Sequence, residues 1–385
     1  MILIKNGKII TVTKGTLKNG CILIKDGKIL KVSEDIEVNE DVRIIDAKGG
    51  WVTPGFIDAH CHIGIFEQDM GFEGTDINEA TDPVTPHLRA IDAINPMDTS
   101  FKDAIKGGVT TVMTGPGSAN PMGGQFVAMK TSGICVDDMV IKEPAAIKIA
   151  FGENPKRIYK SKNKMPTTRM ATAALIREIL TKAQNYKIKK EKALKEGKDF
   201  EENFRLEPLI PVLNKQIPLK AHCHRTDDIL TAIRIAKEFD VNLTLDHCSE
   251  GHLIADYIKQ SGRDVIVGPT LTARTKIEVK NKTFKTPKIL HDNSIKIAIM
   301  TDHPVIPIEY LPLCAGLAAK EGLGIEEALK AITINPAEIC GIDNRVGSLE
   351  VGKDADIVIS NGNPLDSLTS TICTIINGKV EYIKE

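Results

Sequence analysis

The sequence has no excess of charge of either sign and no long hydrophobic run. Its 50 lysines and arginines are balanced by 51 aspartates and glutamates, which leaves a formal charge of -1. Without a basic field, little attracts the phosphates of a nucleic acid or the surface of an anionic membrane. No stretch approaches the roughly 18 apolar residues that a membrane helix needs. We therefore expect a small-molecule substrate as the partner, and neither nucleic acid nor membrane.

We expect no secretory signal peptide, and the sequence has too few cysteines for a disulfide scaffold. Met1–Gly7 reads as a short strand entering a turn, with no cationic segment and no long apolar stretch behind it. The eight cysteines are scattered, and Cys61, Cys223 and Cys248 each adjoin a histidine. This usage is typical of reduced thiols in an intracellular protein. We predict a cytoplasmic location.

Both ends of the chain are rich in short β-branched runs punctuated by glycine or Asn-Gly turns. The first fifty residues predict a small antiparallel sheet, and the last forty repeat the style. We expect residues 1–54 and 336–385 to form one composite β-sandwich domain.

Residues 55–335 change to apolar strands that alternate with amphipathic helices, a pattern of parallel sheets buried on both faces. Eight such strands fit a (β/α)8 barrel of the α/β class, with reactive groups at the strand C-termini. A stretch of about 156–206 is longer than a normal connection and predicts an insertion; its lysine-rich run 187–195 is typical of a solvated helix face. The expected strands are 55–62, 109–114, 125–131, 145–151, 218–223, 242–247, 264–269 and 295–302.

The strongest local signal is the segment that ends in His60-Cys61-His62. Side chains alternate faces along a strand, so both histidines point the same way and Cys61 points to the other. One metal ion can accept both rings. A pair of histidines on an exposed strand face would look the same, so the motif alone leaves ligation open.

Three further strand ends carry possible ligands: His222-Cys-His224, His247 and Asp302. If all of them meet at the C-terminal face of one barrel, neutral imidazoles and a carboxylate surround a divalent cation such as Zn²⁺. Histidines hydrogen-bonded at loop starts are the alternative reading of each member.

Two motifs together resemble the metal-dependent amidohydrolases, in particular the imidazolonepropionase-like and prolidase-like branch. They are Pro54-Gly-Phe-Ile-Asp-Ala-His60-Cys-His62 and Gly347-Ser-Leu-Glu-Val-Gly-Lys-Asp-Ala-Asp356-Ile-Val. The resemblance runs nearly the full length. It implies a distorted (β/α)8 TIM barrel with a β-sandwich assembled from the two chain ends. We further expect a homo-oligomer.

The resemblance implies one or two divalent ions, with zinc the expected metal. In binuclear members a carboxylated fourth-strand lysine bridges two metals, and Lys148 is similar in placement; Glu153 competes for that role, while mononuclear members need neither. An outward-facing Lys148 is also left open. The implied ligands are His60, His62, Lys148, His222, His247 and Asp302.

The implied reaction is hydrolysis of a C–N bond in a small amide, cyclic amide or N-acyl compound by metal-activated water. Asp302 would shuttle the proton. His224, His252 and His303 are equal candidates for contacting the substrate oxygen.

Four smaller questions stay open in the sequence. The glycine-rich loop 114–125 either lines the pocket or only forms turns. Lys156 and Arg157 either bind a substrate carboxylate or are exposed cations without a function. A deaminase of the same superfamily is a rival, although Arg225 stands where its glutamate is expected, three residues after His222. A catalytically silent scaffold or binding protein is the other rival.

Overall fold

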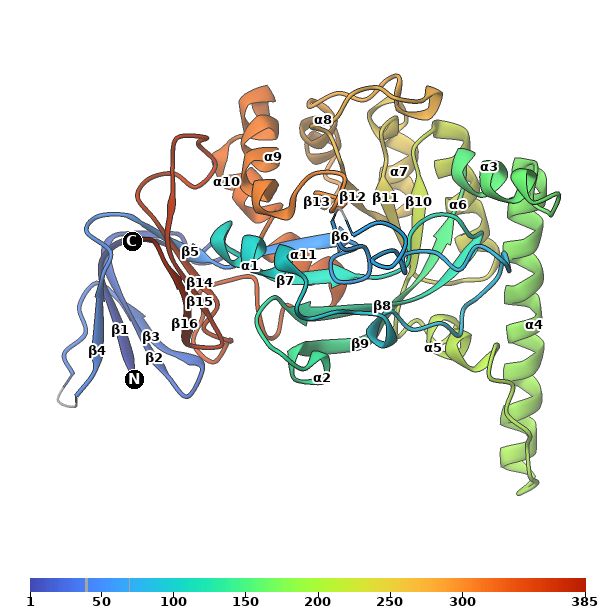
Figure 1. The fold of residues 1–385 in the computed structure, drawn as a ribbon, viewed down its shortest axis with the longest axis horizontal. Coiled ribbons are helices and arrows are strands. Elements are labelled where there is room, and N and C mark those ends of the chain that lie inside the picture. Colours follow the sequence, from blue (N-terminus) through green and yellow to red (C-terminus); the bar gives the residue numbers. More distant parts are fainter. Residues whose placement is uncertain (39–40, 69) are drawn as a thin grey trace.

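The computed structural model describes residues 1–38, 41–68 and 70–385. They form two β-sheets (Figure 1): a barrel sheet in the middle of the chain and a chain-end sheet built from both termini. This confirms the α/β class, the barrel and the joining of the two ends.

The barrel sheet has eight strands in sequence order, so each strand lies beside the next along the chain. All but two of its neighbouring pairs are parallel. The strands are β6 (Phe56–Cys61), β7 (Val109–Thr114), β8 (Met122–Lys130), β9 (Val140–Ala150), β10 (Leu219–Cys223), β11 (Leu243–His247), β12 (Asp264–Val267) and β13 (Ile297–Ile299).

The expectation of eight parallel strands was wrong for β8, which runs antiparallel to both β7 and β9. Only residues 115–121 separate β7 from β8. A parallel crossover needs about a dozen residues or more, so this connection is long enough only for a hairpin. The short distance in sequence between these two strands would have predicted their antiparallel pairing.

The seam between the first and last barrel strands is closed by a segment from further along the chain. The Ile57 N–H donates to the carbonyl of Ile332, and the Ile299 N–H donates to the carbonyl of Ala331. Residues 331–332 therefore occupy the gap between β6 and β13. They lead into α11 (Ile334–Cys340), which packs against both strands.

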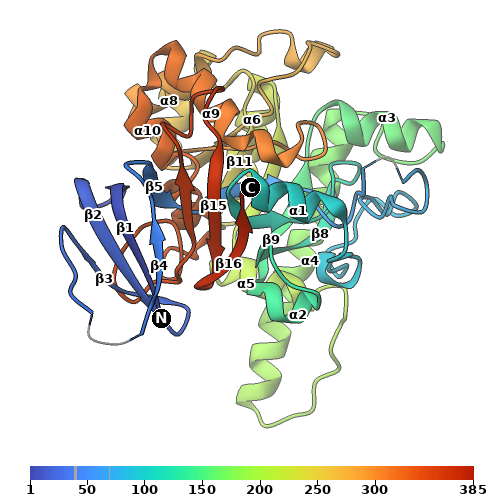
Figure 2. The same ribbon diagram turned by 60° about the vertical axis from the view of Figure 1, so that its left-hand side comes forward.

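Helices cover the outside of the barrel (Figure 1). In α6 (Thr226–Glu238) one face is buried against the barrel, through residues that include Ile229, Ala232 and Ile235. Helix α4 extends away from the body in both views (Figures 1 and 2), and its last turns carry the lysine-rich run as exposed surface. The helices are α1 (Thr99–Lys106), α2 (Val136–Met139), α3 (Glu153–Ser161), α4 (Arg169–Lys195), α5 (Ile210–Leu213), α6 (Thr226–Glu238), α7 (Ala255–Ser261), α8 (Thr286–Asp292), α9 (Leu311–Ala318), α10 (Ile325–Lys330) and α11 (Ile334–Cys340).

The chain-end sheet interleaves strands from both termini (Figure 2). The N-terminal β5 pairs with β14 from the C-terminal end, so neither terminus forms its part of the sheet alone. The sheet is mixed, since β1 pairs in parallel with β4 and β5 and antiparallel with β2. Its strands are β1 (Ile2–Ile10), β2 (Thr16–Lys25), β3 (Lys28–Ser33), β4 (Arg43–Asp46), β5 (Trp51–Pro54), β14 (Ile357–Ser360), β15 (Thr371–Ile376) and β16 (Lys379–Ile383).

A buried ion cluster joins the two sheets. Lys130, at the end of β8, is 2% exposed, and its Nζ lies 3.0 Å from Asp354 Oδ2 and also contacts Asp356. Both aspartates belong to the C-terminal motif identified in the sequence. A buried lysine is tolerated because each of its neighbours carries the opposite charge.

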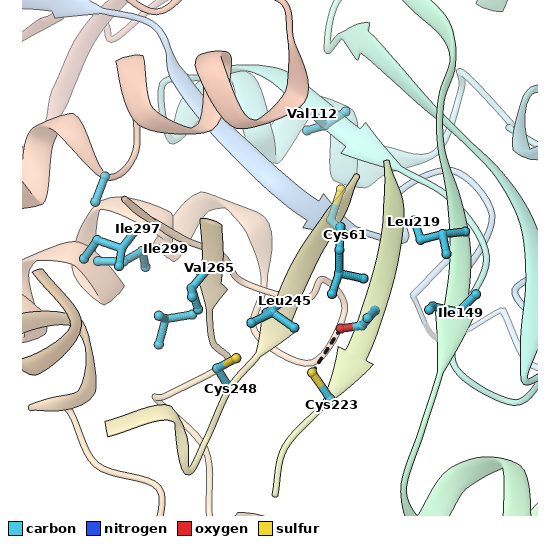
Figure 3. Packing of buried hydrophobic residues seen from close by; sticks show 14 of the residues in the cluster. Cys61, Val112, Ile149, Leu219, Cys223, Leu245, Cys248, Val265, Ile297 and Ile299 are labelled. Carbon is cyan, nitrogen blue, oxygen red and sulfur yellow. Dashed lines mark hydrogen bonds between the residues drawn. The ribbon is translucent and has the colours of Figure 1, made fainter. Parts of the chain in front are cut away.

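The cysteines beside the histidines belong to the apolar layer outside the barrel strands (Figure 3). Cys61 and Cys223 have no exposed surface and pack among aliphatic side chains such as Val112 and Leu245. Because side chains alternate along a strand, these thiols point outward and the histidines on either side of them point inward, as predicted for Cys61. Among the described residues, no helix combines the length and the apolar character needed to cross a bilayer.

Candidate metal centre

Six of the described side chains form two groups at the C-terminal ends of the barrel strands, where each group can hold a metal ion. The potential ligand atoms within a group lie within 4.8 Å of one another. The first group is His60, His62 and Asp302, and the second is His222, His224 and His247. The predicted histidines and Asp302 are thus brought together, and His224 lies with the expected ligands.

In the first group two imidazoles face one carboxylate. Oδ1 of Asp302 lies 3.3 Å from His62 Nε2 and 3.5 Å from His60 Nε2. The Nδ1–H of His62 donates to the carbonyl of Gly115 at 2.7 Å, so the Nε2 of the neutral ring presents a lone pair. A lone pair facing a carboxylate oxygen, with no proton between them, is a site that suits a cation.

In the second group the hydrogen bonds also fix where the lone pairs point. The Nδ1–H of His247 donates to the carbonyl of Gly268 at 2.9 Å, so its Nε2 accepts from His222 Nδ1 at 2.8 Å. This arrangement leaves His222 Nε2 unprotonated, and that buried atom has no hydrogen-bond partner. A buried acceptor without a partner is costly unless a ligand satisfies it. The donor set fits a divalent cation of the zinc type.

Lys148 lies beside the first group. It projects from β9, has no exposed surface, and its Nζ is 3.3 Å from His60 Nε2. Burial lowers the pKa of this lysine to about 8, although the charges of Asp246 and Asp302 act in the opposite direction. Lys148 also lines the cavity described below, whereas Glu153 does not. Of the two fourth-strand candidates, only the lysine is placed among the possible ligands.

Asp58, which the sequence analysis did not single out, ties the two ends of the first group together. Its carboxylate accepts hydrogen bonds from the backbone N–H of His60 at 3.1 Å and of Thr301 at 3.0 Å. The loop that carries Asp302 is thereby fixed to the strand that carries His60.

Asp246 and Lys220 form a second support, also missed. Asp246 Oδ2 lies 2.9 Å from His60 Nδ1, and Asp246 Oδ1 lies 3.3 Å from Lys220 Nζ. The carboxylate favours the His60 tautomer with its proton on Nδ1, which leaves Nε2 free for a metal. The sequence offered one signal for this support, a charged residue inside each of two apolar strands. Asp246 lies immediately before His247, and Lys220 lies two residues before His222.

The backbone is unusual at two of the candidate ligands. His247 has a φ of 73° and Asp302 a φ of 56°, both in the left-handed region that non-glycine residues seldom adopt. At His247 this turn breaks the strand alternation, so that Asp246 and His247 both face the interior. Conformations of this kind concentrate at functional sites.

Burial favours the neutral form of the three histidine rings in the second group. It lowers the pKa of His222 and His247 well below the ordinary value of 6.5, an effect that the neighbouring imidazoles reinforce, and it lowers the pKa of His224 to about 4. At neutral pH the second group therefore offers neutral imidazoles, the form that binds metals.

A cavity of about 630 Å³ opens onto both groups. Its wall includes Gly117 and Ser118, so the glycine-rich loop lines the pocket, and it includes Arg157 but not Lys156. Of the three histidines considered for substrate contact, His224 lines it. His252 and His303 do not, and the expectation that either reaches the pocket is not met: the former pairs with the Thr286 hydroxyl, and the latter is buried with both ring nitrogens unpaired.

Residues 51–381 match the model of the amidohydrolase family. The chain belongs to this family. This amidohydrolase is 28% identical over 375 residues to amidohydrolase tasK of Hapsidospora irregularis, and the match covers 90% of the chain but only 38% of that larger protein. It is 24% identical over 349 residues to an imidazolonepropionase of Colwellia psychrerythraea, covering 84% of the chain and 79% of that enzyme.

Solved structures extend the comparison. The crystal structure of an amidohydrolase from Thermotoga maritima MSB8 has a TM-score of 0.97 and 46% identity, with all of both chains covered. A prolidase structure, at 15% identity and a TM-score of 0.62 over all of both chains, shares the fold. The predicted resemblance to amidohydrolases, with imidazolonepropionase-like and prolidase-like neighbours, is confirmed.

Proposed function

We propose that this amidohydrolase hydrolyses a C–N bond of a small amide, cyclic amide or N-acyl compound, using one or two divalent ions, with zinc the expected metal. The observation that carries the proposal is the meeting of two ligand groups at one cavity, where His62 Nε2 faces the Asp302 carboxylate and the buried His222 Nε2 has no hydrogen-bond partner. Family membership supports it.

The residues that would hold metal are His60, His62 and Asp302 for one ion, and His222 and His247 for a second. A carboxylated Lys148, formed from its neutral amine and carbon dioxide with release of a proton, would supply an anionic ligand beside His60. A divalent cation supplies a Lewis acid that acidifies water and polarises a carbonyl.

The chain's own residues would move the proton and orient the substrate. Asp302, partly exposed to the cavity, would accept the proton of the attacking water and return it to the departing nitrogen. His224 reaches the cavity from β10 and its Nδ1 lies 2.8 Å from the Ser249 hydroxyl. When that hydroxyl donates, the His224 proton lies on Nε2, and the ring can donate to the oxygen that gains charge.

Two rivals remain distinguishable. The cavity wall contains no glutamate among the described residues, and Arg225, which pairs with Asp227, occupies the position where a deaminase is expected to have one. A catalytically silent scaffold would bind no metal and would hydrolyse no substrate.

Metal analysis of protein purified without chelators, followed by a hydrolysis screen of N-acyl amino acids, dipeptides and cyclic ureides, tests the proposal. We expect bound zinc or another first-row metal and turnover of at least one compound. Protein that takes up no metal and hydrolyses nothing after metal loading would support the scaffold instead.

A further inference from the structure

A buried carboxylate, that of Glu278, lies behind the cavity wall without lining it. Glu278 belongs to the loop 268–285 after β12 and is 2% exposed. The backbone N–H of Glu153, the first residue of α3, donates to its Oε2 at 3.0 Å. Its Oε1 lies 2.6 Å from the Nζ of Lys276. An ammonium group and a peptide N–H both favour the ionised form, so Glu278 carries a buried negative charge.

The end of β9 leaves room for this carboxylate because the next turn contains a glycine. Gly152 has a φ of 83°, a conformation that side chains other than hydrogen seldom allow. A Cβ on Gly152 would lie 2.7 Å from Glu278 Oε2 and would displace it. The position of Glu278 is therefore fixed by the backbone on one side and by Lys276 on the other.

The ring of His224 is the third neighbour of the carboxylate. Glu278 Oε1 lies 3.8 Å from His224 Nε2, and His224 Nδ1 lies 2.8 Å from the Ser249 hydroxyl. Both ring nitrogens therefore face a protein group. The neutral ring has a single proton, which either nitrogen can carry.

The charge of Glu278 decides between these two positions. With the proton on Nδ1, the lone pair of Nε2 would face a carboxylate oxygen, which is repulsive. With the proton on Nε2, the N–H faces the negative charge, and Nδ1 accepts a hydrogen bond from the Ser249 hydroxyl. The Lys276 ammonium, which would favour a lone pair on Nε2, is already paired with Glu278 itself.

The separation of 3.8 Å also matters for what the N–H can do. It exceeds the length of an ordinary hydrogen bond, so the carboxylate orients the proton without fully occupying it. Because His224 lines the cavity and Glu278 does not, an oxygen bound in the cavity can accept this proton.

We propose that Glu278 is a positioning residue: it holds the proton of His224 on Nε2, so that His224 donates to the substrate oxygen and is not a third histidine ligand of the second group. In this state Nδ1 accepts from Ser249 and Nε2 carries the proton, so neither nitrogen offers a lone pair to a metal. The second group then presents two histidine ligands, His222 and His247. The donor role rests on the proposed function, because the oxygen gains charge only when a carbonyl is attacked in the cavity.

Nitrogen NMR of histidine-labelled protein, with and without zinc, reads the position of the proton directly. We expect the His224 signal, assigned by its loss in His224→Gln, to show the proton on Nε2. In Glu278→Gln the side-chain carbonyl can keep the Glu153 hydrogen bond while the amide N–H faces His224, so we expect the proton to move to Nδ1. A wild-type proton on Nδ1 would overturn the proposal, as would an unchanged tautomer in Glu278→Gln.

Zinc titration against a competing chelator separates a donor from a ligand without any turnover. We expect His224→Gln to bind zinc within about threefold of wild type. His222→Gln should lose more than the roughly 100-fold that removal of a residue supporting a ligand can cost. Equal losses in the two variants would make His224 a ligand and overturn the assignment.

A double-mutant cycle on a substrate of the enzyme tests whether Glu278 acts through His224. We expect Glu278→Gln to lower kcat roughly 10- to 100-fold, less than complete loss of a donor to a charged oxygen, with KM within about threefold. In the His224→Gln background the same change should have little further effect. Glu326→Gln, at an exposed position of α10, is the matched control.

Equal losses from Glu278→Gln in both backgrounds would show that the carboxylate only supports the loop, and would overturn the proposal while leaving the hydrolase intact. If no C–N compound is hydrolysed by the metal-loaded wild type, the proposed function and the donor role fail together. The NMR and zinc measurements then still decide whether Glu278 sets the His224 tautomer and whether His224 is a ligand.

Discussion

Asp246 Oδ2 lies 2.9 Å from Nδ1 of His60, and neither side chain has any exposed surface. Because Lys220 contacts the other oxygen of the same carboxylate, the histidine is oriented by a charged pair that never reaches the cavity. The orientation of His60 within the first ligand group depends on this contact with Asp246.

Replacing this carboxylate should weaken metal binding. Asp246→Asn removes the charge that keeps the His60 proton on Nδ1, and supports of this kind contribute roughly 10- to 100-fold to metal affinity. Zinc titration of the metal-free protein against a competing chelator measures the loss. The exposed Asp256→Asn serves as control, and a folded Asp246→Asn protein with wild-type affinity would contradict the supporting role.

Asp302→Asn should abolish most turnover while leaving the fold intact. The amide cannot accept the proton of water, and general acid–base groups contribute roughly 10²- to 10⁴-fold to rate. Turnover expressed per bound metal separates this effect from metal loss. Activity within tenfold of wild type at equal metal content would rule out Asp302 as the shuttle; Asp292→Asn, at an exposed helix position, is the control.

Lys148 should make the stability of the metal-free protein depend on pH. Its pKa is about 8 when folded and 10.5 ordinarily, so below pH 8 both states carry the charge and the cost of burying it is fully present. Between these values only the unfolded chain holds the proton, and stability therefore rises with pH, by about 3 kcal/mol in total.

Urea unfolding of wild type and Lys148→Met in carbon-dioxide-free buffer, at pH 7.5 and above 10, measures this effect. The free-energy difference between the two proteins isolates the lysine from other groups that titrate in the range. We expect this difference to move in favour of wild type as pH rises; a difference that stays constant would show that Lys148 is not buried as a charge.

Breaking the ion cluster between the two sheets should be costly. Lys130→Met leaves the buried Asp354 and Asp356 without their shared cation, and removing one partner of a buried pair typically costs about 3–5 kcal/mol. We expect about 3 kcal/mol in urea unfolding, because Lys28 and Arg345 still contact Asp354. Lys106→Met, which breaks an exposed pair with Asp103, should cost less than about 1 kcal/mol.

Much of the fold could be predicted because its signals are local. Strand periodicity located all eight barrel strands, and the composite sheet followed from the similar style of the two ends. The antiparallel direction of β8 was missed because an apolar run does not reveal which way its strand runs. The shortness of the 115–121 connection was the signal that would have revealed it.

The candidate ligands were identifiable because histidines at strand ends are uncommon and the barrel brings those ends together. His252 and His303 could not be separated from His224 by sequence, since loop geometry decides which ring faces the pocket. Arg157 was no different from Lys156 until the helix placed one of them on the cavity wall.

The closing of the barrel seam by residues 331–332 affects the order of assembly during synthesis. Strand β6 leaves the ribosome early, but the backbone groups of Ile57 and Ile299 find their partners only after more than four-fifths of the chain has been made. A nascent chain shorter than this holds an open, unsealed sheet. Chains truncated before Ala331 should therefore be prone to aggregation, and chaperones that shield exposed strand edges should act late in translation.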